Sequence, residues 1–406
     1  MKTVINLMCF CIPFPTIRRK TRRRLQQWWQ NKTNNLSILT RAMSDQPIIL
    51  WVDHALGGGT EVYSMRQFKK LGRDFNVLRL QYMPATQQYH LSMACDKHKM
   101  YQTRDIRDIY NFCCGQNIKQ IVLNNIVAYK DARQILRKIR ELKDKCIGQP
   151  VVSFRGHDYH AICPSFNLID CDGKYCDLSF RTGCENCWRN KILGDNTATH
   201  KVLKSGAETI CDWRNTWEQF LEDVADEIIL FSHATAEIFL RTYPNIAQKI
   251  KIIPHTVPEY EHVQIKPHNG INIAVLGTMA QPKGANVVRA MAEKISTTDN
   301  VKIIVIGTMK QPPKNVRVHG TYRPRALPYI MRKYNIDIVF IPSIWPETFS
   351  YTTSEAMSMG LPIACYDMGA PAERVSQYHR GLVLSEIAPH KNLNQIVQFI
   401  KTGCTK

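Results

Sequence analysis

The chain has 406 residues, of which 44% are hydrophobic and 22% charged, which is typical of a globular protein with more than one domain. It contains no run of 18 or more apolar residues, which argues against a transmembrane helix. Its 54 basic and 34 acidic residues give a formal charge of +20, which indicates an anionic partner: membrane lipid, nucleic acid or a phosphorylated substrate.

The positive charge is concentrated at the start of the chain, where the first 44 residues contain nine Lys or Arg and no acidic residue. An apolar stretch at 4–14 is too short to span a bilayer. It precedes the charges and lacks a cleavage site, so it is a poor signal peptide. The motif RRKTRRR followed by Trp28 and Trp29 suits the lipid headgroup region. We expect residues 1–46 to form a basic extension on a membrane surface. A disordered basic tail and a nucleic-acid-binding arm are the alternatives. Nucleic acid would leave the rest of the chain unexplained, so no nucleic-acid partner is predicted.

From residue 47, short apolar runs alternate with amphipathic stretches. Helices are expected at 131–144 and 235–243. Strands are expected at PIILWVDH, VLRLQYM, QIVLNNIV, PVVSFRGHD, DEIILFS and KIKIIPHTV. This alternation predicts an α/β domain with a mainly parallel sheet over 47–257.

Segment 255–270 is polar and contains two prolines, which predicts a connection between domains. After it the alternation restarts with helices expected at 285–296 and 325–334 and strands at INIAVLGTM, VKIIVIG, VRVHG, IDIVFIP and LPIACYD. A second doubly wound domain is therefore predicted over 270–406. Ligands of such sheets bind at the carboxyl ends of the strands.

Two glutamates, Glu347 and Glu355, stand eight positions apart in PETFSYTTSEAMSMGLP, directly after the strand IDIVFIP. Ser350 suits the N-cap of a helix that ends at Gly360, which places Glu347 in the loop and Glu355 about one turn inside the helix. The amides and dipole of a helix N-terminus favour phosphate. Carboxylates on either side of that phosphate site suit hydroxyl groups, so the segment indicates a nucleotide sugar. The alternative is that both acids are ordinary solvated residues near a helix start.

Together with GTMAQPKG, IIPHTV, GGGTE and SFRGHD, this segment resembles the retaining family 4 glycosyltransferases of the GT-B fold. The likeness covers about 47–384 and is strongest over 336–375, and WPETFSYTTSEA is similar to bacterial enzymes that build O-antigen and capsule polysaccharides. The resemblance implies two Rossmann-like domains facing across a cleft. It also implies transfer of a hexose, with retention, from a nucleoside diphosphate sugar to a lipid-linked or polysaccharide acceptor.

The resemblance assigns a role to each matching position of the two-glutamate segment. Glu347 would hold the hydroxyls of the donor sugar, and Glu355 would hold those of the ribose. The backbone amides of Phe349, Ser350 and Tyr351 would bind the diphosphate.

Further roles follow from the other matching segments. Lys283 in the PKG turn would neutralise the leaving phosphates as negative charge develops on them. His157 would face the donor sugar and stabilise the transition state, and Gly58 and Gly59 would let the backbone approach the donor phosphates. A surface lysine, a structural histidine and a plain tight turn are the respective alternatives. No catalytic metal or other cofactor is implied.

The chain departs from the family after the strand INIAVLGTM. Gly277 is followed by Thr278, where the family usually has arginine, so one expected phosphate cation is missing. Arg323 or Arg325 is a possible substitute. This departure, and a sequence that ends with NLNQIVQFIKTGCTK and so has little room for a further helix, favour the alternative function: a catalytically inactive sugar-nucleotide-binding or scaffold relative.

Fourteen cysteines without a secretory signal indicate reduced thiols in a cytosol. Five of them lie in a Cys-rich loop over 162–188. We expect Cys163, Cys176, Cys184 and Cys187 to hold a structural zinc, with Cys171 as a spare. Only the C-x2-C pair has the spacing of a zinc knuckle, so unbound thiols and a disulfide are alternatives.

The sequence therefore predicts a peripheral enzyme on the cytoplasmic face of the plasma membrane, with a nucleotide-sugar donor. It does not name the base, the sugar or the acceptor.

Overall fold

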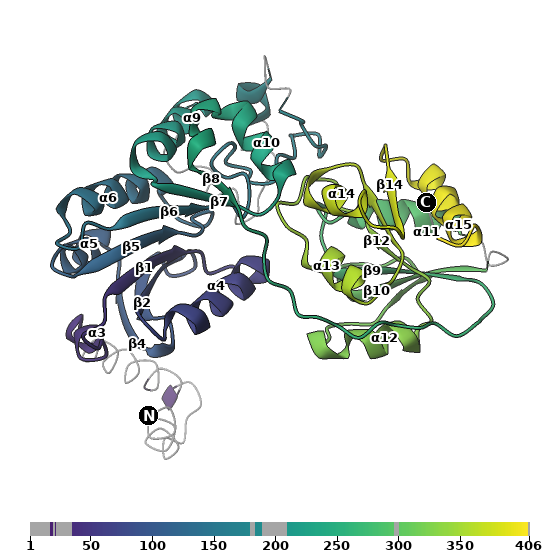
Figure 1. The fold of residues 1–406 in the computed structure, drawn as a ribbon, viewed down its shortest axis with the longest axis horizontal. Helices are drawn as coiled ribbons and strands as arrows, with labels where there is room; N and C mark the ends of the chain where they lie inside the picture. Colours follow the sequence, from purple (N-terminus) through teal and green to yellow (C-terminus); the bar gives the residue numbers. More distant parts are fainter. Residues whose placement is uncertain are drawn as a thin grey trace. The chain divides into compact units, whose positions relative to one another are not determined.

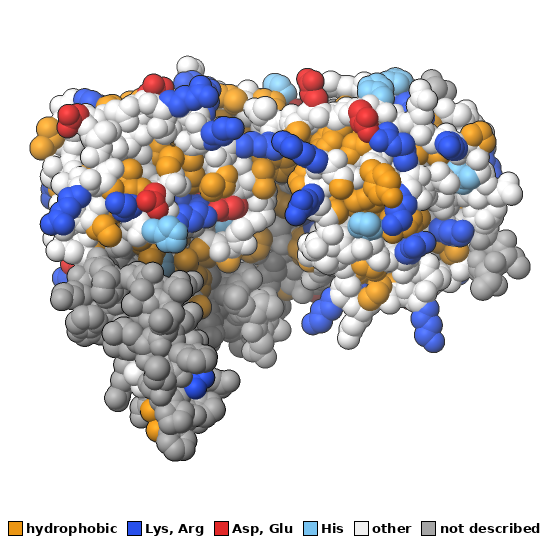
Figure 2. All heavy atoms as spheres, turned by 90° about the horizontal axis from the view of Figure 1, so that it is seen from below, with side chains coloured by type: hydrophobic (Ala, Val, Ile, Leu, Met, Phe, Trp, Pro, Cys, Tyr) orange, Lys and Arg blue, Asp and Glu red, His pale blue; other side chains and the backbone are white. Residues whose placement is uncertain are grey.

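The computed structural model describes residues 17, 18, 21, 35–178, 183–188, 209–295 and 300–404. Most of the basic extension predicted over 1–46 therefore lies outside the described residues. The chain divides into two compact units, Met1–Val152 and Ser153–Lys406. No described helix is both long and apolar enough to cross a bilayer. On the face shown in Figure 2, more basic than acidic side chains are visible, in keeping with the net charge.

The described strands form two sheets (Figure 1). The first has the order β4-β3-β2-β1-β5-β6-β7-β8. Its strands are β1 (Ile48–Asp53), β2 (Asn76–Met83), β3 (Gln88–Met93), β4 (Asp96–Thr103), β5 (Ile118–Leu123), β6 (Val151–Arg155), β7 (Glu227–Leu230) and β8 (Ile250–Ile252). Strand β1 pairs in parallel with β2 and β5, and all six of its residues are buried, as in a strand covered on both faces.

The first unit also contains an antiparallel hairpin that the sequence analysis did not predict. Strand β2 pairs antiparallel with β3, and β3 pairs antiparallel with β4. From residue 35 on, the helices described in this unit are α3 (Ser37–Thr40), α4 (Gly58–Leu71), α5 (Ile106–Cys114) and α6 (Ala132–Lys145). Asp105 and Asp131 cap α5 and α6, because each carboxylate accepts a hydrogen bond from a first-turn amide.

The second sheet is parallel in every pairing and has the order β11-β10-β9-β12-β13-β14. Its strands are β9 (Ile271–Met279), β10 (Val301–Met309), β11 (Val316–Val318), β12 (Ile338–Ile341), β13 (Ile363–Tyr366) and β14 (Gly381–Leu384). Helices α11 (Ala285–Lys294) and α15 (Pro389–Lys401) pack into the core on one face. Helices α12 (Leu327–Lys333), α13 (Tyr351–Ser358) and α14 (Gly369–Val375) pack into the core on the other. This is the doubly wound arrangement predicted from the sequence.

The sheet changes between β8 and β9, in the stretch predicted to connect two domains. The two compact units divide elsewhere, within β6. The predicted domain ranges 47–257 and 270–406 therefore stay a prediction.

Helix α10 (His233–Thr242) has its N-terminus capped from a distant part of the second unit. The Glu373 carboxylate, on α14, accepts from the backbone amides of His233 and Ala234 at 3.2 and 2.7 Å. The hydroxyl of Ser232 accepts from the amide of Thr235. A negative charge at a helix N-terminus is favourable, so this contact joins the segment before β8 to the second sheet.

Candidate functional site

The loop between β12 and α13 carries a buried carboxylate. Glu347 is 2% exposed, and its Oε2 accepts a hydrogen bond from Lys283 Nζ at 2.6 Å. Ser343 Oγ donates to Oε1. The lysine side chain is 42% exposed, so the ion pair is covered on the glutamate side and open on the lysine side. One cation and one hydroxyl thus fix the carboxylate at the carboxyl end of the sheet.

A glycine brings Lys283 to this carboxylate. Gly284 has φ +81°, and an added Cβ would lie 2.0 Å from the carbonyl oxygen of Pro342. The amide of Ile344 donates to the carbonyl of Pro282 at 3.0 Å, which fixes the turn after β9 against the loop after β12. Only glycine permits both this backbone conformation and this close approach. The PKG turn therefore sets the position of the ion pair.

The N-terminus of α13 has the predicted cap. Ser350 is the N-cap, and its hydroxyl accepts from the amide of Thr353, which confirms the predicted helix start. Arg374, from α14, donates to the carbonyl of Ser350 at 2.9 Å, and its guanidinium lies 4.6 Å from the centre of the Phe349 ring. Burial lowers the pKa of Arg374 to about 10, and the nearby Glu347 charge opposes that shift. Arg374 was not identified from the sequence. It places a half-buried positive charge beside the predicted diphosphate site.

Glu355 lies on α13, on the other side of the helix start from Glu347. It is half-buried, and its Oε1 accepts from the hydroxyl of Tyr260 at 3.5 Å. Burial raises the pKa of the neighbouring Tyr322, and the Glu355 charge adds to that rise. The two carboxylates thus occupy the loop and the helix, as predicted from the spacing. Whether they hold sugar and ribose stays a prediction.

The structure brings His157 to the same segment. The hydroxyl of Thr348 donates to the backbone carbonyl of His157 at 2.7 Å. The His157 ring lies 5.4 Å from the ring of His255, which stacks on Phe349 at 4.4 Å. His255 Nδ1 also lies 2.8 Å from the hydroxyl of Tyr351. His255 is therefore a further residue of this site, and the predicted positions 157, 349 and 351 are neighbours through it.

The predicted glycines lie in two places. Gly58 and Gly59 begin α4 in the first unit, and Gly58 has φ +77°, a value that side chains rarely adopt. Gly277 lies near the end of β9 with φ +102°, and the backbone of Gly307 on β10 packs directly against it.

Thr278 is exposed, and its hydroxyl accepts from Thr308 on the neighbouring strand at 3.3 Å. Arg323 and Arg325, considered as substitutes for the missing arginine, are both exposed on the segment before α12. Arg374, on a different helix, contacts the start of α13 through Ser350 and Ser354.

His160, three residues after His157, belongs to the core. It is 4% exposed, and its ring lies edge-on to Trp213 at 4.8 Å. Its carbonyl accepts from Trp213 Nε1 at 2.8 Å. Burial lowers the pKa of His160 to about 3, so the ring is neutral at physiological pH. These contacts describe a packed structural histidine.

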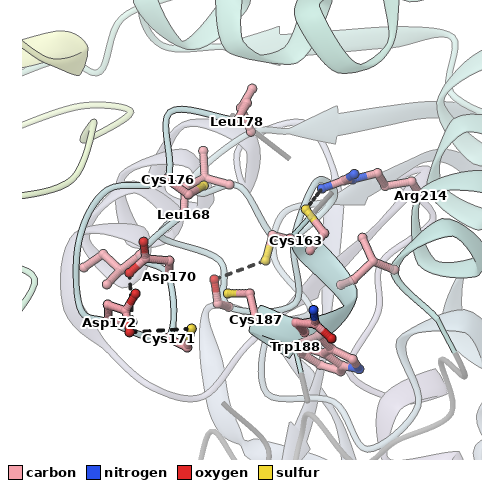
Figure 3. Close-up of a pocket in the computed structure, with 16 residues that line it drawn as sticks. Cys163, Leu168, Asp170, Cys171, Asp172, Cys176, Leu178, Cys187, Trp188 and Arg214 are labelled. Carbon is pink, nitrogen blue, oxygen red and sulfur yellow. Dashed lines mark hydrogen bonds between the residues drawn. The ribbon is translucent and has the colours of Figure 1, made fainter. Parts of the chain in front are cut away.

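The predicted zinc ligands line one cavity of the second unit, shown in Figure 3. None of these four cysteines, nor Cys171, forms a disulfide. Among the residues described by the structure, no three His, Cys, Asp or Glu side chains are close enough together to form a ready metal-binding group. The zinc site therefore stays a prediction.

Comparison with known proteins adds to this geometry. Residues 257–403, which include Lys283, Glu347, Glu355 and Arg374, match the family model for glycosyl transferases group 1. The search of curated proteins found no match.

Several solved structures are similar over most of the chain. The Anabaena protein Alr3699/HepE in complex with UDP is 14% identical, with 89% of this chain and 92% of that chain covered and a TM-score of 0.54. The lipopolysaccharide outer core galactosyltransferase WaaB is 12% identical, with coverage of 89% and 92% and a TM-score of 0.55. Sucrose-phosphate synthase from Thermosynechococcus elongatus is 14% identical, with coverage of 88% and 90% and a TM-score of 0.54. The fold is GT-B. The prediction of two Rossmann-like sheets is confirmed.

Proposed function

We propose that the protein is a retaining glycosyltransferase that transfers a hexose from a nucleoside diphosphate sugar to a lipid-linked or polysaccharide acceptor. The observation that carries the proposal is the buried Glu347 carboxylate, paired with Lys283 at 2.6 Å beside the capped N-terminus of α13. A cation, helix amides and a carboxylate provide, in one place, groups that bind phosphate and sugar hydroxyls.

The ion pair has a defined part in the proposed reaction. The donor's C1–O bond breaks, and its electron pair passes to the diphosphate. The Lys283 ammonium, 42% exposed, neutralises the charge that develops there. Glu347 accepts hydrogen bonds from the sugar hydroxyls and so fixes the ring. The acceptor hydroxyl attacks C1 on the face that the diphosphate leaves, and its proton passes to a diphosphate oxygen. The configuration at C1 is therefore retained.

The missing arginine at Thr278 bears on this proposal. Arg374 supplies positive charge at the other side of the loop, because its guanidinium binds the Ser350 carbonyl at the start of α13. The Arg374 side chain is half-buried, so solvent screens its charge less than the charge of a fully exposed lysine. This charge supports activity over the alternative of an inactive nucleotide-binding relative.

UDP is the first nucleotide to test. The similar Anabaena protein has been solved with UDP and with UDP-glucose. For the acceptor and location, the support is the basic extension over 1–46, which suits the anionic inner surface of a plasma membrane. Catalysis by Lys283, helix amides and Glu347 needs no bound metal in this scheme.

The test begins with thermal shift of the whole chain against UDP, GDP, ADP, CMP and their sugars. The nucleotide sugar that raises the melting temperature is then incubated with lipid-linked and polysaccharide acceptors, and the anomeric configuration of the product is read by NMR. Glu347→Gln should keep nucleotide binding and lose transfer. Glu386→Gln, at an exposed carboxylate paired with Lys391, is the matched control and should behave as wild type.

The outcomes separate the proposed function from its alternative. Transfer with inversion would refute the retaining mechanism. Nucleotide binding without hydrolysis or transfer to any acceptor would support the inactive relative. No thermal response to any nucleotide or sugar would refute the donor site at α13.

A further inference from the structure

A cavity of about 410 Å³ lies in the first unit, and its lining contains none of the residues assigned above to sugar transfer. Tyr82, near the end of β2, and Tyr89, near the start of β3, contribute to it, as do Arg104, directly after β4, and Lys130, shortly before α6. Strands β2 and β4 both pair antiparallel with β3, so they point the same way and end at one edge of the sheet. This is the carboxyl edge, where doubly wound sheets bind ligands. The hairpin that the sequence analysis did not predict thus helps to form the cavity.

The cavity is one strand away from the glycine loop that begins α4. Strands β1 and β2 are neighbours, and Asp53 lies opposite Gln81. Gln81 Nε2 donates to the carbonyl of His54 at 2.7 Å, which holds the end of β2 against the loop after β1. Tyr82 follows Gln81 directly, and Gly58 follows His54 by four residues. Since neighbouring strands are only about 4.8 Å apart, the cavity and the loop predicted to approach the donor phosphates are neighbours at the same edge of the sheet.

Three tyrosines pack together at the cavity, and they differ in how their hydroxyls are satisfied. The ring centres of Tyr82 and Tyr89 are 5.1 Å apart, and those of Tyr129 lie 5.8 and 6.2 Å from them. The Tyr129 hydroxyl lies 3.1 and 2.9 Å from the carbonyl oxygens of Asp53 and Leu80, to which it donates. Tyr82 and Tyr89 are 4% and 5% exposed, and no group among the described residues hydrogen-bonds to either hydroxyl. Buried hydroxyls in folded proteins normally have a partner, so these two suit a ligand that supplies one.

Both hydroxyls keep their protons at neutral pH. Burial raises the pKa of Tyr89 to about 12, and the neighbouring Tyr82, Asp131 and Asp105 add to that rise. Burial also raises the pKa of Tyr82. A neutral phenol donates one hydrogen bond and accepts others, which is the hydrogen-bonding capacity of a sugar hydroxyl as well.

The charged groups in the lining cancel one another. Arg104 and Lys130 are basic and exposed, and Asp105 and Asp131 are the acidic caps of α5 and α6. An anion would face two carboxylates here and a cation would face two basic side chains, so a charged ligand is disfavoured. Gln134, half-buried on the first turn of α6, adds an amide that both donates and accepts. Donors and acceptors beside aromatic rings suit a neutral sugar.

We propose that this cavity binds a neutral pyranose unit of the acceptor, with Tyr82, Tyr89 and Gln134 hydrogen-bonding to its hydroxyls. Its volume of about 410 Å³ falls within the range of about 300 to 1,000 Å³ that is typical of small-molecule sites. The inference rests on the proposed function and narrows it, because it requires an acceptor that already carries a sugar. A bare lipid phosphate has neither the hydroxyls nor the neutral charge that this lining matches.

The first test measures sugar binding to the whole chain with no nucleotide present, so it does not depend on transfer. The methyl glycosides of glucose, galactose, mannose and N-acetylglucosamine are titrated one at a time, and binding is followed by saturation-transfer NMR. We expect at least one of them to bind. Tyr82→Phe and Tyr89→Phe each keep the ring and remove one hydroxyl, so each should weaken that binding about three- to tenfold, the effect of one neutral hydrogen bond. Tyr101→Phe is the matched control: it lies on β4, its hydroxyl bonds to Asp108 and it does not line the cavity, so binding should stay unchanged.

A second test uses kinetics and a variant on the helix, which keeps the proposal testable if a tyrosine variant does not fold. Gln134→Leu and the two Phe variants should each raise the acceptor KM about three- to tenfold and leave the donor KM unchanged.

The results that would overturn the sugar site are distinct from those that would refute the proposed function. The site is refuted if none of the four glycosides binds, if Tyr82→Phe and Tyr89→Phe bind as the wild type does, or if methyl glucuronide or glucose 1-phosphate binds more tightly than every neutral glycoside. Transfer with an unchanged acceptor KM in all three variants would also refute it while leaving the proposed function intact. Glycoside binding that depends on both tyrosines, in a chain that binds no nucleotide, would refute the proposed function and leave the sugar site.

Discussion

Replacing Lys283 with Met removes the cation from a carboxylate that has almost no access to water. Glu347 is 2% exposed and would keep only the Ser343 hydroxyl as a side-chain donor in the described contacts. Methionine keeps most of the apolar length of the lysine stem. The change therefore isolates the loss of the charge partner from loss of packing.

The expected cost follows from the exposure of the two partners. Exposed ion pairs contribute about 0 to 1 kcal/mol, whereas removing one partner of a fully buried pair costs about 3 to 5 kcal/mol. The Glu347 side chain is 3% exposed and that of Lys283 is 42% exposed, so this pair lies between the two cases. We expect Lys283→Met to lower the free energy of unfolding by about 2 kcal/mol. Glu347→Gln should cost less, because the amide leaves no buried charge.

A double-mutant cycle in urea measures the coupling. The double variant Lys283→Met/Glu347→Gln should be more stable than the sum of the single changes predicts, by about 1 kcal/mol or more. Lys391→Met is the matched control, since its partner Glu386 is exposed, and its cost should stay below about 1 kcal/mol. If Lys283→Met shifts the urea midpoint no more than Lys391→Met does, the carboxylate is solvated and the reasoning is wrong.

Three further predictions concern separate parts of the chain. Glu355→Gln should weaken nucleotide binding about tenfold or more in calorimetry, since a charge-assisted hydrogen bond contributes about 1.5 to 3 kcal/mol. The melting temperature of the free protein should stay unchanged. Gly284→Ala should destabilise the fold by more than about 2 kcal/mol in thermal unfolding, because the new Cβ would clash with the Pro342 carbonyl at a φ that is already unfavourable for a side chain. Gly403→Ala is the control: its φ is +91° but no atom lies near its Cβ position, so it should cost only about 1 kcal/mol. His160 has a pKa of about 3 in the folded chain, against 6.5 in the unfolded chain. Between these two pH values only the unfolded chain binds the proton, so the free energy of unfolding should fall as the pH drops, by about 2 kcal/mol at pH 5. His160→Gln should remove that share of the pH dependence, and an unchanged pH profile would contradict the assignment.

Much of the second sheet was predictable because its strands are continuous apolar runs. Strands β9, β10 and β12 are rich in Ile and Val, which is typical of parallel strands covered on both faces. The start of α13 was predictable from Ser350, because capping chemistry is local.

The hairpin of β3 and β4 was not predictable in the same way. Strand β4, DKHKMYQT, has no buried residue and no alternation of polar and apolar side chains. At the edge of a sheet, pairing depends on the neighbouring strand more than on a pattern of its own.

Part of the candidate site also has no local signal. The hydrogen bond from Thr348 to the carbonyl of His157 joins positions 191 residues apart. Arg374 reaches the start of α13 from another helix, and His255 does so from the segment after β8. The sequence analysis included IIPHTV, which contains His255, but assigned that histidine no role, and it missed Arg374, which only tertiary packing brings to the site.

The cap that Glu373 provides for α10 has a consequence for dividing the chain experimentally. The family match begins at residue 257, which invites cutting there to obtain a donor-binding fragment. That cut would leave Glu373 in one fragment and the amides of His233 and Ala234 in the other. It would also part His157 from Thr348. The two pieces are therefore better suited to fragment complementation, in which each recovers its shape on meeting the other, than to separate study.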